Sequence, residues 1–173
     1  MPHIKSIALT LILFVGCSQI VSKPTVAVES SPILIGPITR DQLTAEPYGN
    51  WFGPGYEQFE VDSALSSQLR DRIKDIDILI FFGTWCGDSK REVPKIYRIF
   101  DALNVPERRI RLVAMDRNKE TPDNLENGLE IRRVPTILFY ESGIELGRII
   151  ERPVKTLMED MQAILLPEGT PAD

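Results

Sequence analysis

The chain has 173 residues, enough for one domain with appended segments. Hydrophobic residues make up 43% of it and charged residues 26%, as in an ordinary globular protein, and a formal net charge of -5 argues against nucleic acid as a partner. The single histidine is His3. If the N-terminus is removed, the remaining chain cannot use Ser-His or Cys-His catalysis or a histidine-ligated zinc ion.

Residues 1–16 have the pattern of an export signal. Lys5 precedes an apolar run over residues 7–15, which is too short to cross a bilayer and suits the apolar core of a signal peptide. The segment 14–17 resembles a bacterial lipobox, although Phe14 departs from the usual Leu, and this resemblance implies lipidation of Cys17. The alternative is an ordinary cleaved signal with an incidental cysteine.

Lipidation would place the protein in the bacterial cell envelope, anchored by lipid on the periplasmic side. Ser18 after the cysteine resembles a sorting signal for the outer membrane. Because the lipid would consume the Cys17 thiol, Cys86 would be the one free thiol in a compartment that permits disulfides.

Two segments separate this anchor from the predicted domain. Residues 17–35 mix Ser, Val and Pro without periodicity, which is typical of a flexible tether. Residues 36–61 are rich in aromatic residues and turn formers. We interpret them as an N-terminal extension that packs its aromatic side chains on the domain, the alternative being a ligand or partner surface.

Hydrophobic periodicity predicts the first elements of the domain. Asp62 is a candidate cap for a helix in which Leu65, Leu69 and Ile73 recur every four residues. The continuous apolar run over residues 77–83 predicts a strand buried on both faces. A second helix follows, and its apolar face is Val93, Ile96, Phe100 and Leu103.

The second half of the domain predicts further strands and helices. We expect a strand over 109–116, a short helix within 118–132 that ends near Gly128, a strand over 134–140, a turn at Ser142 and Gly143, a returning strand over 145–151, a helix over 154–165 and a polar tail over 167–173. This order predicts an α/β fold with a mixed central β-sheet flanked by helices.

Three motifs then resemble the thioredoxin family. Trp85-Cys86-Gly87 resembles the start of its Trp-Cys-Gly-Pro-Cys site, and Pro94 lies where thioredoxins carry a helix-kinking proline. Val134-Pro135-Thr136 resembles the segment whose cis-proline faces the active cysteine. The resemblance covers residues 62–166 and implies a thioredoxin fold, with Cys86 as the catalytic thiol and Val134 and Pro135 as substrate-binding residues.

The site departs from the family at two positions. Ser89 replaces the second active-site cysteine, and Ile80 stands where thioredoxins place a buried acid. The helix N-terminus favours a thiolate at Cys86, Ser89 is expected to donate a hydrogen bond to its sulfur, and the charge of Asp88 opposes the thiolate. A single thiol can form a mixed disulfide but needs another thiol to release it.

These features predict monothiol thiol–disulfide exchange in the cell envelope. The partners would be envelope proteins with disulfides or mixed disulfides, and an external thiol donor or another oxidoreductase. The alternative is a non-catalytic adaptor with a degenerate site. The Cys-Gly-Asp-Ser motif also resembles monothiol glutaredoxins, but Trp85 and the missing Gly-Gly-x-Asp motif argue against that reading. We expect no metal and no cofactor.

Overall fold

The computed structural model describes residues 32–167. The predictions for the signal peptide, for Cys17, for most of the tether and for the tail after residue 167 lie outside these residues. Within the described part of the chain, no helix is long and apolar enough to cross a bilayer.

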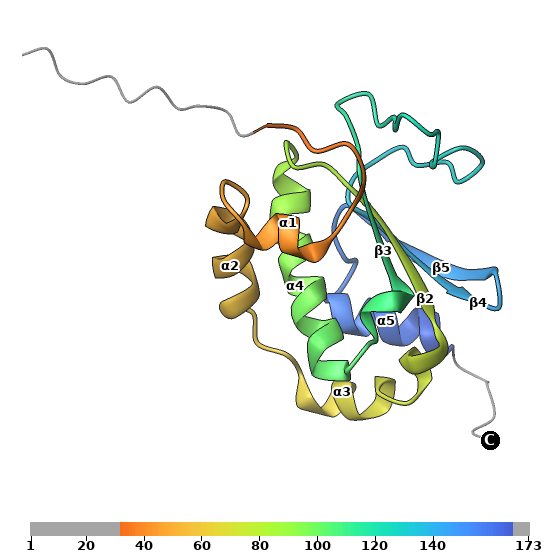
Figure 1. Cartoon of the computed structure of the whole chain (residues 1–173). Coiled ribbons are helices and arrows are strands. Elements are labelled where there is room, and N and C mark those ends of the chain that lie inside the picture. The colour runs from red at the N-terminus through yellow and green to blue at the C-terminus, as the bar shows by residue number, and fades with distance from the viewer. Residues whose placement is uncertain (1–31, 168–173) are drawn as a thin grey trace, which may run out of the picture. The chain divides into compact units, whose positions relative to one another are not determined.

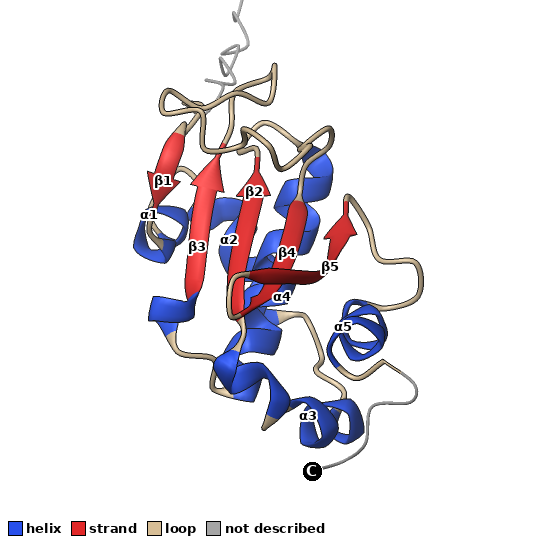
Figure 2. Ribbon diagram, turned by 90° about the vertical axis from the view of Figure 1, so that its right-hand side faces the viewer, coloured by secondary structure: helices blue, strands red, loops and turns tan. Residues whose placement is uncertain are grey.

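A five-stranded mixed sheet forms the centre of the domain, with the strand order β1-β3-β2-β4-β5 (Figure 2). β2 runs parallel to β3, while β1 pairs antiparallel with β3, and β2, β4 and β5 pair antiparallel in turn. The strands are β1 (Gly36–Ile38), β2 (Asp77–Phe82), β3 (Ile110–Ala114), β4 (Thr136–Glu141) and β5 (Ile144–Ile150). The predicted mixed sheet of a thioredoxin fold is thereby confirmed.

Three of the helices lie where the sequence predicts them, namely after Asp62, after Cys86 and within residues 154–165. Asp62 caps the first predicted helix by accepting hydrogen bonds from the backbone N–H groups of Ala64 and Leu65. The α-helices are α1 (Arg40–Thr44), α2 (Gly49–Glu57), α3 (Ser63–Leu69), α4 (Gly87–Leu103) and α5 (Leu157–Leu165), with short 3-10 helices at Arg72–Asp75 and Glu107–Arg109. α1, α2 and β1 come from the aromatic-rich segment 36–61.

The larger apolar cluster joins one face of the sheet to all five of these α-helices. Figure 1 shows how the helices are arranged beside the strands. Tyr48 and Phe52 of the aromatic-rich segment are buried in this cluster, and the Phe52 ring lies 5.8 Å from that of Tyr97 in α4. Gly55 of α2 faces Pro94, where an added Cβ would lie 2.7 Å from the proline ring. The segment therefore packs its aromatic side chains on the domain, as interpreted from the sequence.

Hydrogen bonds also link the aromatic-rich segment 36–61 to α4. Arg40 donates two hydrogen bonds to Asp101, at 2.9 and 2.6 Å, and the hydroxyl of Tyr56 donates a third at 2.5 Å. Burial opposes the ionisation of Asp101, but the hydrogen bonds from Arg40 and Tyr56 outweigh it and lower the pKa of this carboxyl.

The opposite face of the sheet is covered differently. Phe81, Val113 and Leu138 of the strands pack there against side chains of the segment 115–134. The short helix expected within residues 118–132 is wrong, because this segment is a series of turns. Lys119, Asn124, Gly128 and Glu130 all adopt positive φ, which breaks an α-helical run.

Side chains replace helical hydrogen bonds in this segment. Asp116 accepts the backbone N–H of Glu120 at 2.9 Å, and the hydroxyl of Thr121 accepts that of Leu125 at 2.9 Å. The segment consequently leads in an irregular path from β3 to the residues that contact Cys86.

Candidate active site

Cys86 lies at the junction of β2 and α4. It is the N-cap residue of α4, with φ -89° and ψ 127°, and its side chain is half-buried. Its thiol donates a hydrogen bond to the carbonyl oxygen of Val134, with Sγ and O 3.3 Å apart. The peptide bond between Val134 and Pro135 is cis. The structure thus brings together Cys86, Val134 and Pro135, which the sequence had placed in one site.

Trp85 is held in place beside the cysteine. Its indole N–H donates to the carbonyl oxygen of Met115 at 2.9 Å, and the guanidinium of Arg117 lies 5.5 Å from its ring centroid. The ring also covers Gly83, where an added Cβ would lie 2.7 Å from the indole. Gly83 is therefore required by the close approach of the tryptophan ring.

Ser89 takes a role that differs from the expected one. It is fully buried, and its hydroxyl accepts the backbone N–H of Gly83 at 3.1 Å. Among the described residues it makes no hydrogen bond to the sulfur of Cys86, so that expectation is wrong. The side chain points inward from the first turn of α4 and ties this turn to the end of β2, leaving Cys86 without a second reactive group there.

The charge of Asp88 is balanced by a neighbour on the same helix. Arg91 donates to Asp88 at 2.6 Å and to the buried Glu92 at 2.5 Å, and its hydrogen bond to Asp88 raises the pKa of this guanidinium. Lys95 also lies 3.4 Å from Glu92. Because Arg91 offsets the carboxylate, Asp88 opposes a negative charge on Cys86 less than its sequence position suggests.

The position of the missing acid is apolar. Ile80 is fully buried in the middle of β2, between Leu112 of β3 and Ile137 of β4. Gly87, the first residue of α4, is exposed and has open space where a side chain would project. The buried position of Ile80 therefore carries no side chain that could accept a proton. At Gly87 no side chain narrows the access to the sulfur of Cys86.

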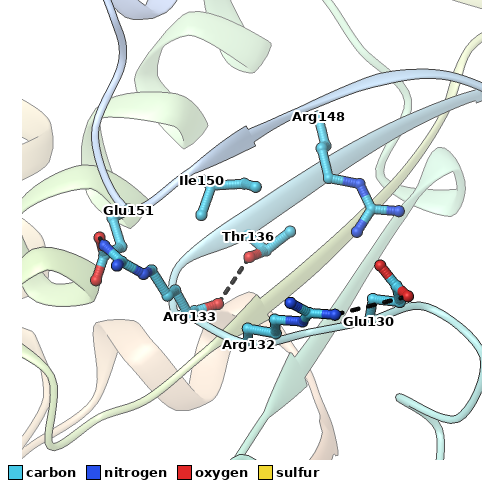
Figure 3. Close-up of a pocket in the computed structure, with 7 residues that line it drawn as sticks. All are labelled: Glu130, Arg132, Arg133, Thr136, Arg148, Ile150 and Glu151. Carbon is cyan, nitrogen blue, oxygen red and sulfur yellow. Dashed lines mark hydrogen bonds and ion pairs between the residues drawn. The ribbon is translucent and has the colours of Figure 1, made fainter.

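A cavity of about 460 Å³ opens beside the segment that contacts Cys86 (Figure 3). It is lined by residues before and after Pro135 and by β5, namely Glu130, Arg132, Arg133, Thr136, Arg148, Ile150 and Glu151. These arginines were not singled out from the sequence, since charged residues in a turn are usually solvated, and only the pairing of β4 with β5 brings Arg148 to Arg132. In residues 32–167, no group of three or more His, Cys, Asp or Glu residues could hold a metal ion.

Comparison with known proteins places this geometry in a family. The family model described as Thioredoxin matches residues 53–163. The chain belongs to the thioredoxin family. It is 30% identical over 101 residues to a thioredoxin-like protein of Acanthamoeba polyphaga mimivirus, covering 56% of this chain and 71% of that protein.

Two further relatives are thioredoxins by name. Thioredoxin-2 of Saccharomyces cerevisiae is 28% identical over 91 residues, which cover 53% of this chain and 77% of the yeast protein. The solved structure of mitochondrial thioredoxin 3 from the same yeast, in its oxidized form, is 28% identical, with a TM-score of 0.34 over 49% of this chain and 76% of that one. The yeast thioredoxin and the matching family model thus agree on the family of this chain.

Proposed function

We propose that this thioredoxin-family protein carries out monothiol thiol–disulfide exchange through Cys86. One observation carries the proposal: the half-buried thiol lies at the N-terminus of α4, 3.3 Å from the carbonyl oxygen next to Pro135, while a buried serine occupies the place of a second cysteine. A helix N-terminus stabilises a thiolate, which is the nucleophile in disulfide exchange.

The reaction takes two exchange steps. The thiolate of Cys86 attacks one sulfur of a disulfide R–S–S–R′, forms the mixed disulfide Cys86–S–S–R and releases R′–S⁻. A second thiolate R″–S⁻ then attacks the mixed disulfide, which restores Cys86 and gives R–S–S–R″. When R″ belongs to the substrate, the outcome is isomerisation. When an external thiol donor or another oxidoreductase supplies it, a further thiolate R″–S⁻ must also attack R–S–S–R″, which releases R–S⁻, forms R″–S–S–R″ and completes the reduction of the substrate.

The same proposal places the protein in the bacterial cell envelope, anchored through lipid on Cys17. Its support is the signal-like run 7–15 and the lipobox-like segment 14–17. The chain also enters the domain beside the site, since the backbone N–H of Leu34 donates to the hydroxyl of Thr84 at 3.2 Å. Loss of membrane fractionation in Cys17→Ala, with wild-type protein retained in the membrane fraction, is the expected result; equal fractionation of both would contradict the anchor.

The exchange chemistry is tested on the full chain carrying Cys17→Ala, so that Cys86 is its one thiol. Reduction of bis(2-hydroxyethyl) disulfide and refolding of a scrambled disulfide substrate are measured with an added small thiol. Both rates should fall to the uncatalysed level in the variant that also carries Cys86→Ala. Equal rates with and without Cys86 would overturn the proposal.

Partial burial of Cys86 favours a second candidate, a non-catalytic adaptor that holds an envelope protein. An adaptor would retain its partner when Cys86 is replaced by Ser and would show no rate difference in the assay above. An exchange protein would lose both its mixed disulfides and its rate enhancement in that variant.

A further inference from the structure

Arginine side chains gather next to the segment that contacts the reactive thiol. Arg132 and Arg133 directly precede Val134, whose carbonyl oxygen accepts the Cys86 thiol. Both side chains line the cavity of about 460 Å³, together with Arg148 from β5 (Figure 3). A positively charged wall thus begins one residue away from the atoms that face the sulfur, although the whole chain carries a net charge of -5.

Most hydrogen-bond donors of the two loop arginines remain available. Arg132 is 82% exposed and lies 3.8 Å from Glu130, an exposed ion pair that contributes little. Arg133 uses one nitrogen to donate to Glu151 at 2.6 Å. A guanidinium has five N–H donors in a planar fork that matches a carboxylate. Arg132 and Arg133 can therefore donate hydrogen bonds to a further carboxylate.

Arg148 differs from these two arginines, because each of its three guanidinium nitrogens already donates a hydrogen bond within the protein. It donates two hydrogen bonds to Glu145, each at 2.6 Å, and one to the carbonyl oxygen of Leu129 at 2.7 Å. It fixes the turn that carries Arg132 and Arg133 against β5. The side chains of Thr136 and Ile150 lie between the arginines in Figure 3 and give the cavity a partly apolar wall.

A further cation lies beside Trp85, the residue that precedes Cys86. Arg117 is exposed, stacks on Trp85 at 5.5 Å and has no ion pair among residues 32–167. An extended peptide advances about 3.3 Å per residue. An acidic residue about two or three positions from a cysteine bonded to Cys86 would thus come within reach of Arg132 and Arg133, which lie two and one residues before Val134.

We propose that the cavity lined by Arg132 and Arg133 binds a substrate carboxylate, so that Cys86 exchanges preferentially with disulfides in acidic peptide segments. This inference rests on the proposed function, since the acidic segment is the group R in the exchange described above. The covalent steps are unchanged: the sulfur of the acidic segment becomes bonded to Cys86, the leaving thiolate takes the electron pair, and an incoming thiolate later restores Cys86.

The test compares two short peptides that differ only in charge. Each has one cysteine, flanked by two Glu or by two Lys, in a disulfide with 2-mercaptoethanol. Their rate constants with the full chain carrying Cys17→Ala are measured by mass spectrometry. We expect the acidic peptide to react about three- to tenfold faster at low salt, and the ratio to approach one in 0.5 M salt.

Charge reversal at the cavity provides the decisive comparison. The double variant Arg132→Glu and Arg133→Glu should reverse the preference. The matched control, Arg108→Glu with Arg111→Glu, makes the same change of charge at another cavity, which is also lined by Asp77, Leu79 and Tyr140. This control variant should keep the preference for the acidic peptide. An unchanged preference in the first variant would overturn the inference, as would equal rates for the two peptides.

Failure of the inference and failure of the proposed function give different results. If bis(2-hydroxyethyl) disulfide reacts with Cys86 but the two peptides react equally, the exchange stands and the acidic specificity falls. If Cys86 reacts with nothing, the exchange falls. Carboxylate binding at the cavity is then measured by fluorescence anisotropy of labelled peptides with Ser in place of Cys. Tighter binding of the acidic peptide that is lost when Arg132 and Arg133 are changed to Glu supports carboxylate binding. Equal binding of the two peptides overturns it.

Discussion

The thiol of Cys86 donates a hydrogen bond to the carbonyl oxygen of Val134 at 3.3 Å, across 48 residues of sequence. This contact joins the N-terminus of α4 to the segment that leads into β4. Val134 is directly preceded by Arg132 and Arg133, which line the cavity of about 460 Å³. The contact thus links the thiol of Cys86 to the segment that lines this cavity.

Replacing Ser89 with Cys should convert the one-thiol site into a two-thiol site. The new thiol would stand three residues after Cys86 in the first turn of α4, at the cost of the hydrogen bond from Gly83, about 1 kcal/mol. A mixed disulfide on Cys86 should then be released without added thiol, as followed by intact mass. Ser89→Ala loses the same hydroxyl and should keep the adduct. Equal persistence of the adduct in both variants would contradict this expectation.

Replacing Gly83 with Ala should displace the ring of Trp85. The added Cβ would lie 2.7 Å from the indole, so the ring must move and its hydrogen bond to Met115 is lost. We expect a loss of about 1–3 kcal/mol in the free energy of unfolding, together with a shifted indole N–H resonance. Gly87→Ala is the matched control, since its Cβ meets nothing within 4 Å. Equal stability of the two variants would refute the close packing at Gly83.

The pair of Asp88 and Arg91 should tune the reactivity of Cys86 in opposite directions. Asp88→Asn removes a negative charge near the sulfur and should speed alkylation at neutral pH by about two- to tenfold. Arg91→Ala leaves Asp88 without the guanidinium that lies 2.6 Å from it and should slow alkylation. Rates are measured with iodoacetamide, which is neutral. Rate changes of the same sign in both variants would rule out this electrostatic explanation.

Asp101 should stabilise the fold in a pH-dependent manner. Because its pKa is lowered in the folded state, its contribution is complete above the unfolded value of about 3.9 and is lost as the pH falls through the lower folded value. Asp101→Asn should cost about 1–2 kcal/mol at pH 7, and the difference from wild type should vanish in acid. Urea unfolding across pH measures it, with the exposed Asp123→Asn as control. A constant difference down to pH 2 would contradict the role of the carboxylate.

Much of the fold follows from local patterns in the sequence. The apolar run at β2, the helical spacing of Val93, Ile96 and Phe100, and the cap at Asp62 each describe an element that packs as its pattern predicts. The segment 118–132 forms turns instead of the predicted helix, because its conformation depends on residues at positive φ and on side chains that accept hydrogen bonds from backbone N–H groups. Periodicity carries no signal for either effect.

The site was predictable to the extent that its residues lie in motifs. The resemblance placed Cys86 near Pro135, and the structure shows the contact at Val134. The inward position of Ser89 and its bond to Gly83 required the orientation of the first turn of α4. The cavity required the register of β4 against β5, which places Leu138 opposite Arg148 and Thr136 opposite Ile150.

Intact-mass spectrometry shows whether Cys86 forms mixed disulfides that it cannot resolve alone. The full chain carrying Cys17→Ala is mixed with excess bis(2-hydroxyethyl) disulfide, the reagent and the released 2-mercaptoethanol are removed by gel filtration, and a small thiol is added later. We expect one adduct, located on Cys86, that persists until the thiol is added and then disappears. An adduct that resolves without added thiol, or a Cys86 that stays unmodified while a cysteine peptide reacts, would contradict this expectation.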